Sequence, residues 1–469
     1  MLKQKIKEIF TKDFLFTFWY VMLVALFVYV TWFFDVGAYA MLVLGILAAF
    51  VLVISKDITP LIPIFFMLTQ VISDAPATFN AYPIYISAAA IIIVAMVFNI
   101  IYYKQFSNYG KIKGFTITVV FMGLSMILGG LTTFSERIPI AIGVVVIYGV
   151  LSVAFTFYFM KAMGKDNGEK ASKVILYSIL LSALIAIAQV ITILLRSGDI
   201  LGTIAGKKIS TGYGNPNYLA NIIARAVPIL IYLSTGKKRF SCLYLVGALL
   251  CGVFIFTLSS RASLLCTFIM AIFVLIYFAR KVERKIPWIC TLVGMLVLVG
   301  IVVGVFWDKI TDLFARMINM GFDSNGRFEL YRIGWERFKQ HPIFGVGLDY
   351  DIGSKFSFTP YWYHNTVIQA IACFGIVGLL ALLGYLYWQY RIIIKTKYLP
   401  MKAVFFTLIL MQFISMLDVF FYTPQEFVQM IIITVVAIQL LDEKETDSHL
   451  YSLCDMIKEK RKGKEENNV

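Results

Sequence analysis

Few side chains in this sequence could carry acid–base chemistry, and histidine is the first to consider. The protein has three histidines. His449 lies near the C-terminus and His341 precedes a proline, whereas His364 opens an apolar run within the sequence Tyr363-His364-Asn365. An imidazole at that position could take a proton near neutral pH, or it could simply hydrogen-bond at a helix end. His364 is therefore the candidate base, with the structural role left open.

A glycine-rich segment before another apolar run could bind an anion. Lys207 and Lys208 precede a turn that contains Asn215, Pro216 and Asn217. Glycine lets backbone N–H groups approach an anion, proline suits the start of a helix, and a helix N-terminus attracts negative charge. The same residues could equally form an ordinary capped turn.

Arginines occur at two further places between apolar runs. Arg261 follows two serines at the end of a run, where it could bind an anion or extend its charged end toward water. Three more arginines lie in the segment RFELYRIGWERFKQHP, whose spacing predicts a short amphipathic helix that stops at Pro342. The alternative for these three is a solvated helix face: Arg327, Arg332 and Arg337.

Arg225 differs from the other basic residues because it lies inside an apolar run. It is about ten residues from the start of that run, which at ~1.5 Å per residue places it near the middle of a membrane. A charge there costs about 2.5–3.5 kcal/mol on insertion scales and usually faces a polar cavity. No acidic residue at the same depth is evident, and Asp418 is a candidate partner for Arg261 instead. We predict a functional or structural role for Arg225 inside a polar cavity.

The elements that must position these residues are membrane helices. The chain is 60% hydrophobic and 15% charged, whereas soluble domains are about 25% charged. A run of about 20 apolar residues can cross a ~30 Å hydrocarbon core. We therefore predict an all-α polytopic membrane protein with about 14 transmembrane helices, and at least 12. They are expected at 14–34, 38–54, 60–72, 84–102, 114–134, 139–160, 174–195, 215–234, 240–258, 262–279, 287–306, 365–388, 403–421 and 427–441.

The distribution of positive charge predicts the orientation of these helices. With residues 1–13 in the cytoplasm, the inner segments hold 29 of the 42 Lys and Arg residues, the outer segments hold 12, and Arg225 lies within a span. This asymmetry follows the positive-inside rule, so the net charge of +15 indicates contact with membrane lipids and no nucleic-acid partner. The transmembrane domain covers 14–441 and includes one long outer loop at 307–364, and the tail at 442–469 is expected in the cytoplasm.

Taken together, four ordered stretches resemble the O-antigen ligase and polysaccharide polymerase superfamily of bacterial membrane glycosyltransferases. The resemblance runs from about residue 209 to residue 384, over a third of the chain. The stretches are STGYGNPNYLA at 210–220, TLSSRASLL at 257–265, GWERFKQHPIFGVGL at 334–348 and YHNTVIQAIACFGIVGLL at 363–380.

The resemblance implies a membrane glycosyltransferase fold and a glycan donor carried on undecaprenyl diphosphate. Arg261 would bind the diphosphate and His364 would act on the acceptor hydroxyl, as catalytic residues on the extracytoplasmic side of the cytoplasmic membrane. Fixed cations would stabilise the charge of the leaving diphosphate without a metal or another cofactor. Family members often have an arginine where this chain has Lys207 and Lys208, and lysine lacks the bidentate fork of arginine. The expected substrate-binding residues are Lys207, Lys208, Asn215, Asn217, Arg225, Arg327, Arg332 and Arg337.

Several functions stay open at this point. A polymerase would pass the glycan to another repeat unit, and we expect this activity first. A ligase would pass a finished glycan to another lipid, polymer or protein. A flippase for lipid-linked oligosaccharides would also suit fourteen spans, but it predicts internal repeats and evenly short loops. A peptidoglycan-type polymerase would depend on an outer carboxylate, and a non-catalytic scaffold gives no reason for Arg225.

Overall fold

The structure is a computed structural model, and it is helical throughout the regular elements that it describes. It describes residues 14–72, 82–105, 113–132, 149–163, 168–212, 216–305, 307, 311, 327–347, 363–418 and 420–441. The prediction of an all-α chain is confirmed over these residues. In a bilayer every backbone N–H and C=O must be paired within the protein, and a helix does this within a single segment.

Six helices among the described residues are long and apolar enough to cross a membrane. These are α3 (Gly37–Ile54), α10 (Gly168–Arg196), the pair α12 (Pro216–Ala224) and α13 (Ala226–Ser234), α15 (Arg261–Ala279), α16 (Lys285–Val305) and α19 (Thr366–Lys395). Each coincides with one of the predicted spans.

The other predicted spans coincide with helices whose apolar stretch among the described residues is shorter, so the exact number of crossings stays a prediction. These helices are α2 (Phe18–Phe33), the interrupted run of η2 (Thr59–Leu61), α4 (Ile62–Met67) and η3 (Leu68–Val71), α6 (Tyr82–Tyr102), α7 (Lys113–Thr132), α9 (Ser152–Ala162), α14 (Leu243–Thr257), α20 (Leu399–Ser415) and α21 (Pro424–Gln439). The first part of the span predicted at 139–160 lies outside the described residues.

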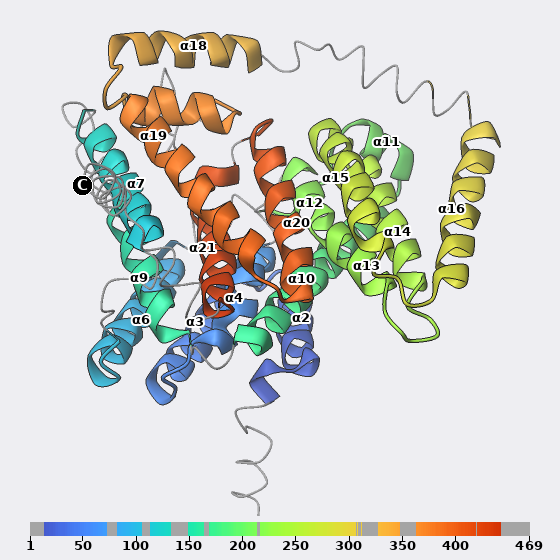
Figure 1. Ribbon diagram of the computed structural model, residues 1–469, viewed down its shortest axis with the longest axis horizontal. Coiled ribbons are helices and arrows are strands. Elements are labelled where there is room, and N and C mark those ends of the chain that lie inside the picture. The colour runs from blue at the N-terminus through green and yellow to red at the C-terminus, as the bar shows by residue number, and fades with distance from the viewer. Residues whose placement is uncertain are drawn as a thin grey trace, which may run out of the picture.

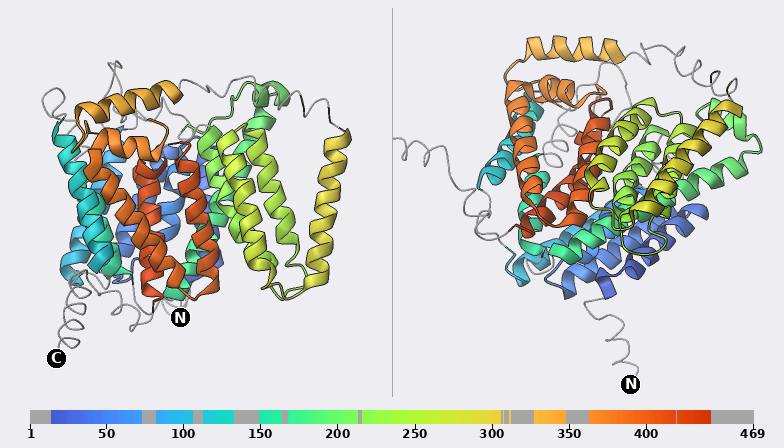
Figure 2. Two further views of the ribbon diagram at one scale, coloured as in Figure 1. Left: turned by 45° about the horizontal axis from the view of Figure 1, so that its top comes forward. Right: turned by 45° about the vertical axis from the view of Figure 1, so that its right-hand side comes forward.

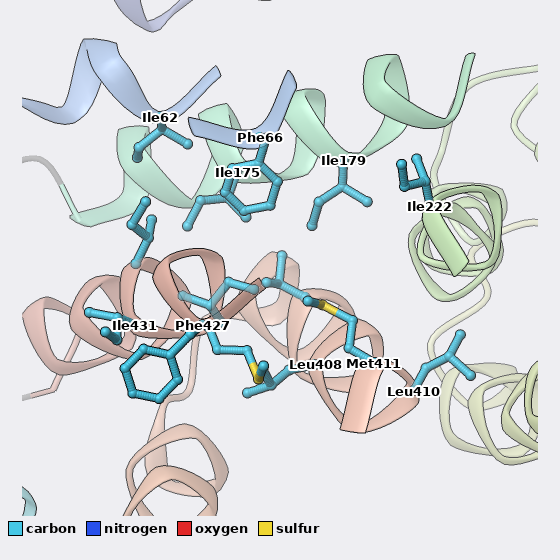
Figure 3. Close-up of a cluster of buried hydrophobic side chains, with 14 of the residues drawn as sticks. Ile62, Phe66, Ile175, Ile179, Ile222, Leu408, Leu410, Met411, Phe427 and Ile431 are labelled. Carbon is cyan, nitrogen blue, oxygen red and sulfur yellow. The ribbon is translucent and has the colours of Figure 1, made fainter. Parts of the chain in front are cut away.

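The centre of the bundle is formed by helices that are far apart in sequence. Apolar side chains from α4, α10, α12, α20 and α21 meet there, as Figure 3 shows for Ile62, Phe66, Ile175, Ile222 and Leu408. More than half of the most apolar stretch of α10 is buried. Close packing of this kind holds the shorter, interrupted helices in place, because apolar lipid gives little hydrophobic drive for helices to associate.

Helix α19 is broken at Gly375, which the predicted span at 365–388 did not anticipate. Gly375 has a φ of 65°, a backbone conformation that strongly favours glycine. The segment before α19 pairs the backbone groups that the break releases: Ile376 N–H donates to the Pro342 carbonyl at 2.8 Å, and Val346 N–H donates to the Ala372 carbonyl at 2.9 Å. The first half of α19 therefore lies across the top of the bundle, and the second half descends through it (Figures 1 and 2).

The amphipathic helix predicted in the long loop is present as α18 (Arg327–Gln340). It lies over the first half of α19 (Figure 1). Gly334 is the buried residue of α18, and an added Cβ there would come within 2.5 Å of Ile368 and 2.9 Å of Tyr363. The helix is thus fixed against the start of α19 by close contact.

Helix α16 stands apart from the bundle (Figure 1). Trp288, near its start, is its buried residue, and the indole Nε1–H donates to Ser234 Oγ at 2.8 Å. The remaining side chains of this helix are exposed or half-buried. Apart from its first turns, α16 therefore presents its apolar surface to lipid.

The basic turns and the start of α15 lie at opposite ends of the same helices. The turns at 235–242 and 280–284 meet, because Glu283 N–H donates to the Thr235 carbonyl at 3.1 Å and Lys237 Nζ lies 3.9 Å from Glu283 Oε1. Helix α14 runs from this end toward Arg261, and α15 returns from Arg261. Arg261 is thus separated from the basic turns by the full length of α15, as the positive-inside pattern predicts.

Candidate active site

The start of α19 and the end of α20 bring His364 beside an aspartate. Asn365 Nδ2 donates to the Met416 carbonyl at 2.9 Å, and Thr366 Oγ1 donates to the Ser415 carbonyl at 2.7 Å. These bonds hold the two helix ends together. His364 Nδ1 then lies 2.8 Å from Asp418 Oδ1. An ionised carboxylate can only accept, so it pairs with a protonated Nδ1, and in the neutral imidazole this tautomer leaves the lone pair on Nε2.

The backbone of His364 is fixed in an uncommon conformation. Its φ is 50°, in the left-handed region that few non-glycine residues occupy. The Tyr331 hydroxyl of α18 donates to the His364 carbonyl at 3.1 Å. Asn365 caps α19, since its Oδ1 accepts from Val367 N–H at 2.9 Å and from Ile368 N–H at 3.0 Å. The backbone of His364 is therefore held by α18 and by the cap of α19, and its imidazole by Asp418 just beyond the end of α20.

One arginine contacts this pair, and a lysine links that arginine electrostatically to a second one. Arg327 Nη2, at the start of α18, lies 3.8 Å from Asp418 Oδ2. Burial lowers the pKa of the Lys207 ammonium below its usual value, and the positive charges of Arg261 and Arg327 lower it further. Lys207 therefore lies within electrostatic reach of both arginines, and Arg327 contacts the His364–Asp418 pair directly.

Backbone strain is concentrated in the segments that carry this group. Among the described residues, five other than glycine have a positive φ: Asp35, Lys104, Lys207, Ser259 and His364. Lys207 and His364 belong to the site, and Ser259 lies two residues before Arg261. Such conformations cost about 1–3 kcal/mol each, persist only where the surrounding structure enforces them, and cluster at functional sites.

The structure brings some of the predicted residues together and leaves others apart. Arg332 forms an ion pair with Glu329 one turn away, and Arg337 Nη1 donates to Gln340 Oε1 at 3.2 Å. Lys208 is exposed, and Asn217 is half-buried in the first turn of α12. Asn215 lies outside the described residues.

Arg225 has an acidic partner, and the expectation that none lies at its depth was wrong. Arg225 Nη2 lies 2.5 Å from Glu426 Oε1, and Nη1 donates to Gln429 Oε1 at 2.7 Å. The predicted spans leave Glu426 in the outer connection between 403–421 and 427–441. The chain instead turns down after Asp418 and α21 begins deeper than α20 ends (Figure 1), so its first turn reaches Arg225.

Asp418 is a candidate site residue whose contacts with His364 and Arg327 the sequence did not predict. Its pairing with Arg261, for which the sequence made it a candidate, stays a prediction. An acidic residue at the end of a long apolar run was the available signal, but its partners depend on how α20 and α19 meet. No group of three or more His, Cys, Asp or Glu that could hold a metal ion occurs in the described ranges.

One comparison with known proteins bears on this group of residues. Residues 246–383 match the O-antigen ligase family model. The matched region contains Arg261, Arg327 and His364, and it includes three of the four motifs from the sequence. It supports the O-antigen ligase and polysaccharide polymerase superfamily that those motifs predicted. No curated protein matches the chain.

The O-antigen ligase match and the apolar helices agree on the class of protein. Together they indicate a multi-pass membrane protein that handles glycans in a glycosyltransferase-type reaction. The O-antigen ligase region ends within the second half of α19, before Asp418, and begins after Lys207 and Arg225. The site described above therefore combines residues from inside the matched region with residues from outside it.

Proposed function

We propose that this protein is a glycosyltransferase at the outer face of the cytoplasmic membrane that polymerises the repeat units of a surface polysaccharide. The donor would be a glycan on undecaprenyl diphosphate, and the acceptor a hydroxyl of another glycan. The observation that carries this proposal is the His364–Asp418 pair with Arg327 beside it and with Lys207 within electrostatic reach of Arg327 and Arg261. A base next to an anion site is the arrangement that transfer from a sugar diphosphate needs.

The reaction can be written in one displacement. The acceptor oxygen forms a bond to the anomeric carbon of the donor glycan, while the bond from that carbon to the diphosphate oxygen breaks. Undecaprenyl diphosphate leaves with the bonding electron pair. The proton of the acceptor hydroxyl passes to His364 Nε2, and Asp418 stabilises the imidazolium that forms, because its carboxylate already holds Nδ1.

The cations would bind the diphosphate and stabilise the charge that develops on it. Arg261 can make two parallel hydrogen bonds to phosphate oxygens, and Arg327 can do the same if it turns from Asp418. Lys207 can add a point charge. Roles for Lys208, Asn215, Asn217, Arg225, Arg332 and Arg337 in binding the donor or the glycan stay predictions.

The proposal is tested by single substitutions in reconstituted membranes with the lipid-linked donor. His364→Ala should reduce the rate about 10²- to 10⁴-fold, the usual contribution of a positioned acid or base, with membrane abundance unchanged. His341→Ala is the matched control, since His341 belongs to the same outer segment and makes no side-chain contact with the His364 group in the described structure. Wild-type activity in His364→Ala would refute the assignment.

Arg261 is tested by two substitutions. Arg261→Ala should abolish transfer without loss of protein from the membrane. Arg261→Lys separates charge from geometry, because lysine keeps the charge but cannot form the paired hydrogen bonds of a guanidinium. Retained activity in Arg261→Lys would show that charge is sufficient there, and full activity in Arg261→Ala would remove Arg261 from the mechanism.

A ligase is the second candidate, because the matching family model is that of O-antigen ligase. It would use the same donor and the same base, and would differ in its acceptor: another lipid, a polymer or a protein. A strain that lacks the protein distinguishes the two activities. Accumulated single repeat units on the lipid indicate a polymerase, and full-length chains left unattached indicate a ligase. Units that stay on the cytoplasmic side would instead indicate a flippase.

A further inference from the structure

A second polar cluster lies inside the membrane part of the protein, at the break between α12 and α13. The side chains of Asn221, Arg225 and Glu426 are all buried, with relative exposures of 0%, 4% and 0%. Ionisable groups at this depth are costly and usually have a function. The ion pair between Arg225 and Glu426 accounts for only part of their hydrogen-bonding capacity.

Four polar atoms of this cluster have no partner among the described residues. They are Asn221 Nδ2, Asn221 Oδ1, Arg225 Nε and Glu426 Oε2. In the described part of the chain, Asn221 is the one residue whose side chain has two such atoms. Each buried polar group without a partner carries a large desolvation cost, so four close together call for an explanation.

Asn221 lies on the face of α12 whose side chains bond to α21. Asn221 and Arg225 are four residues apart, and Arg225 N–H still donates to the Asn221 carbonyl at 3.3 Å across the break. Residues at this spacing share a helix face. Tyr218, one turn above, donates its hydroxyl to Gln425 Oε1 of α21 at 2.7 Å. The face that carries Asn221 is therefore joined to α21 above by Tyr218 and below by Arg225.

The unpartnered atoms match the hydrogen-bonding pattern of water. Asn221 Nδ2 and Arg225 Nε are donors, and Asn221 Oδ1 and Glu426 Oε2 are acceptors. A buried water molecule makes about three hydrogen bonds and needs both kinds of partner. We infer that Asn221, Arg225 and Glu426 enclose a site for ordered water, with at least one molecule bound between α12 and α21.

This water site connects the two segments that carry part of the candidate active site. Helix α12 follows the segment with Lys207, and α21 follows Asp418 after one short helical turn, η7 (Phe420–Tyr422). Thr407 Oγ1 of α20 also donates to the Arg225 carbonyl at 2.9 Å, so all three helices meet at the break. Water that completes the ion pair therefore helps to hold these three helices together.

Substitution of Asn221 by leucine, of similar size and without polar atoms, tests the site. If water is bound, Asn221→Leu removes partners from it and should lower the apparent Tm of the full chain in detergent by about 2 °C or more. If no water is bound, the same change removes two unpaired polar atoms and should raise the Tm. Thr267→Val is the control, because Thr267 Oγ1 is a lone buried atom without a partner and its loss should not lower the Tm.

Radiolytic labelling in water enriched in oxygen-18 gives a second, direct test on the wild-type protein. Hydroxyl radicals formed from bound water oxidise buried side chains next to it. Tyr218 lies on the same face of α12 as Asn221, bonds to Gln425 beside Glu426 and is 8% exposed. It should therefore be labelled faster than Tyr158 of α9, which is 5% exposed. Asn221→Leu should reduce the labelling of Tyr218. Labelling of Tyr218 no faster than that of Tyr158 would overturn the inference, whatever the change in Tm.

Discussion

At the scale of single residues, the proposed chemistry depends on which nitrogen of His364 carries the proton. Asp418 Oδ1 lies 2.8 Å from Nδ1, and a carboxylate, which only accepts, favours the proton on that nitrogen. An asparagine could donate to Nδ1 and so move the proton to Nε2, where the base must be free. The aspartate is therefore a positioning residue for the imidazole.

Asp418→Asn should reduce the transfer rate about 10²- to 10⁴-fold, a loss comparable to that in His364→Ala. The double variant should be no slower than either single variant, because both changes remove the same function. These losses are measured as initial transfer rates of the single and double variants with the lipid-linked donor. Glu329→Gln on the exposed side of α18 is the control. Additive losses in the double variant would separate Asp418 from His364.

Lys207 should make donor binding sensitive to alkaline pH. Burial first, and then Arg261 and Arg327, lower the pKa of Lys207, so it loses its proton at a lower pH than an ordinary lysine does. The site then loses one positive charge, and the KM for the diphosphate donor should rise as pH increases toward the usual lysine pKa of about 10.4. Lys207→Arg should shift that rise to higher pH, since arginine stays protonated. Identical pH profiles for the two proteins would contradict this role.

At the scale of elements, the sequence was sufficient to place the helices. It did not reveal the break within α19 or the depth at which α21 begins. Apolar length predicted the positions of the spans, and amphipathic spacing predicted α18, because both patterns are local. The break in α19 was missed because Gly375 interrupts neither pattern, and a positive φ leaves no trace in hydropathy. The depth of α21 was missed because it depends on how the chain turns down after Asp418. Glu426 was consequently counted as a loop residue.

Gly375→Ala should disturb the start of α19 and the site with it. An added Cβ would lie 2.3 Å from the Ile343 carbonyl oxygen, at a φ of 65°. The substitution should destabilise the protein by about 1–3 kcal/mol and reduce transfer, because α18 and His364 are attached to this turn. Gly300→Ala on α16 is the matched control: nothing lies within 4 Å of its added Cβ, so it should be neutral or slightly stabilising. The apparent Tm and the transfer rate are measured for both variants.

At the scale of the whole molecule, the candidate site and the basic turns lie at opposite ends of the bundle. Helix α18 and the starts of α15 and α19 lie at one end of the bundle (Figure 1), and Arg327, Arg261 and His364 lie at or directly before the starts of these helices. The sequence predicted this separation from charge alone, because positive residues that stay in the cytoplasm mark every second connection. It could not predict which outer residues meet, since that depends on contacts between helices far apart in sequence.

The predicted orientation can be measured with an impermeant thiol reagent on intact cells, in a background without the natural cysteines. Cysteines that replace Lys208 or Arg332, both exposed, should be labelled from outside. A cysteine that replaces Lys238, exposed in the turn after α13, should be labelled only after the membrane is made permeable. The opposite result would place the candidate site in the cytoplasm and exclude the proposed donor, whose glycan is presented outside.

The isolation of α16 has a consequence for how its sequence can change over generations. Trp288 bonds to Ser234, and Leu292 and Met295 pack against the core, but no described residue of this helix beyond Met295 is buried. Leucine, isoleucine, valine and phenylalanine should therefore replace one another freely along that part of the helix, while a charge at its centre would cost about 2.5–3.5 kcal/mol. Selection on this segment should act on its length and hydrophobicity rather than on the shapes of its side chains. Its residue identities should therefore vary while its length is conserved.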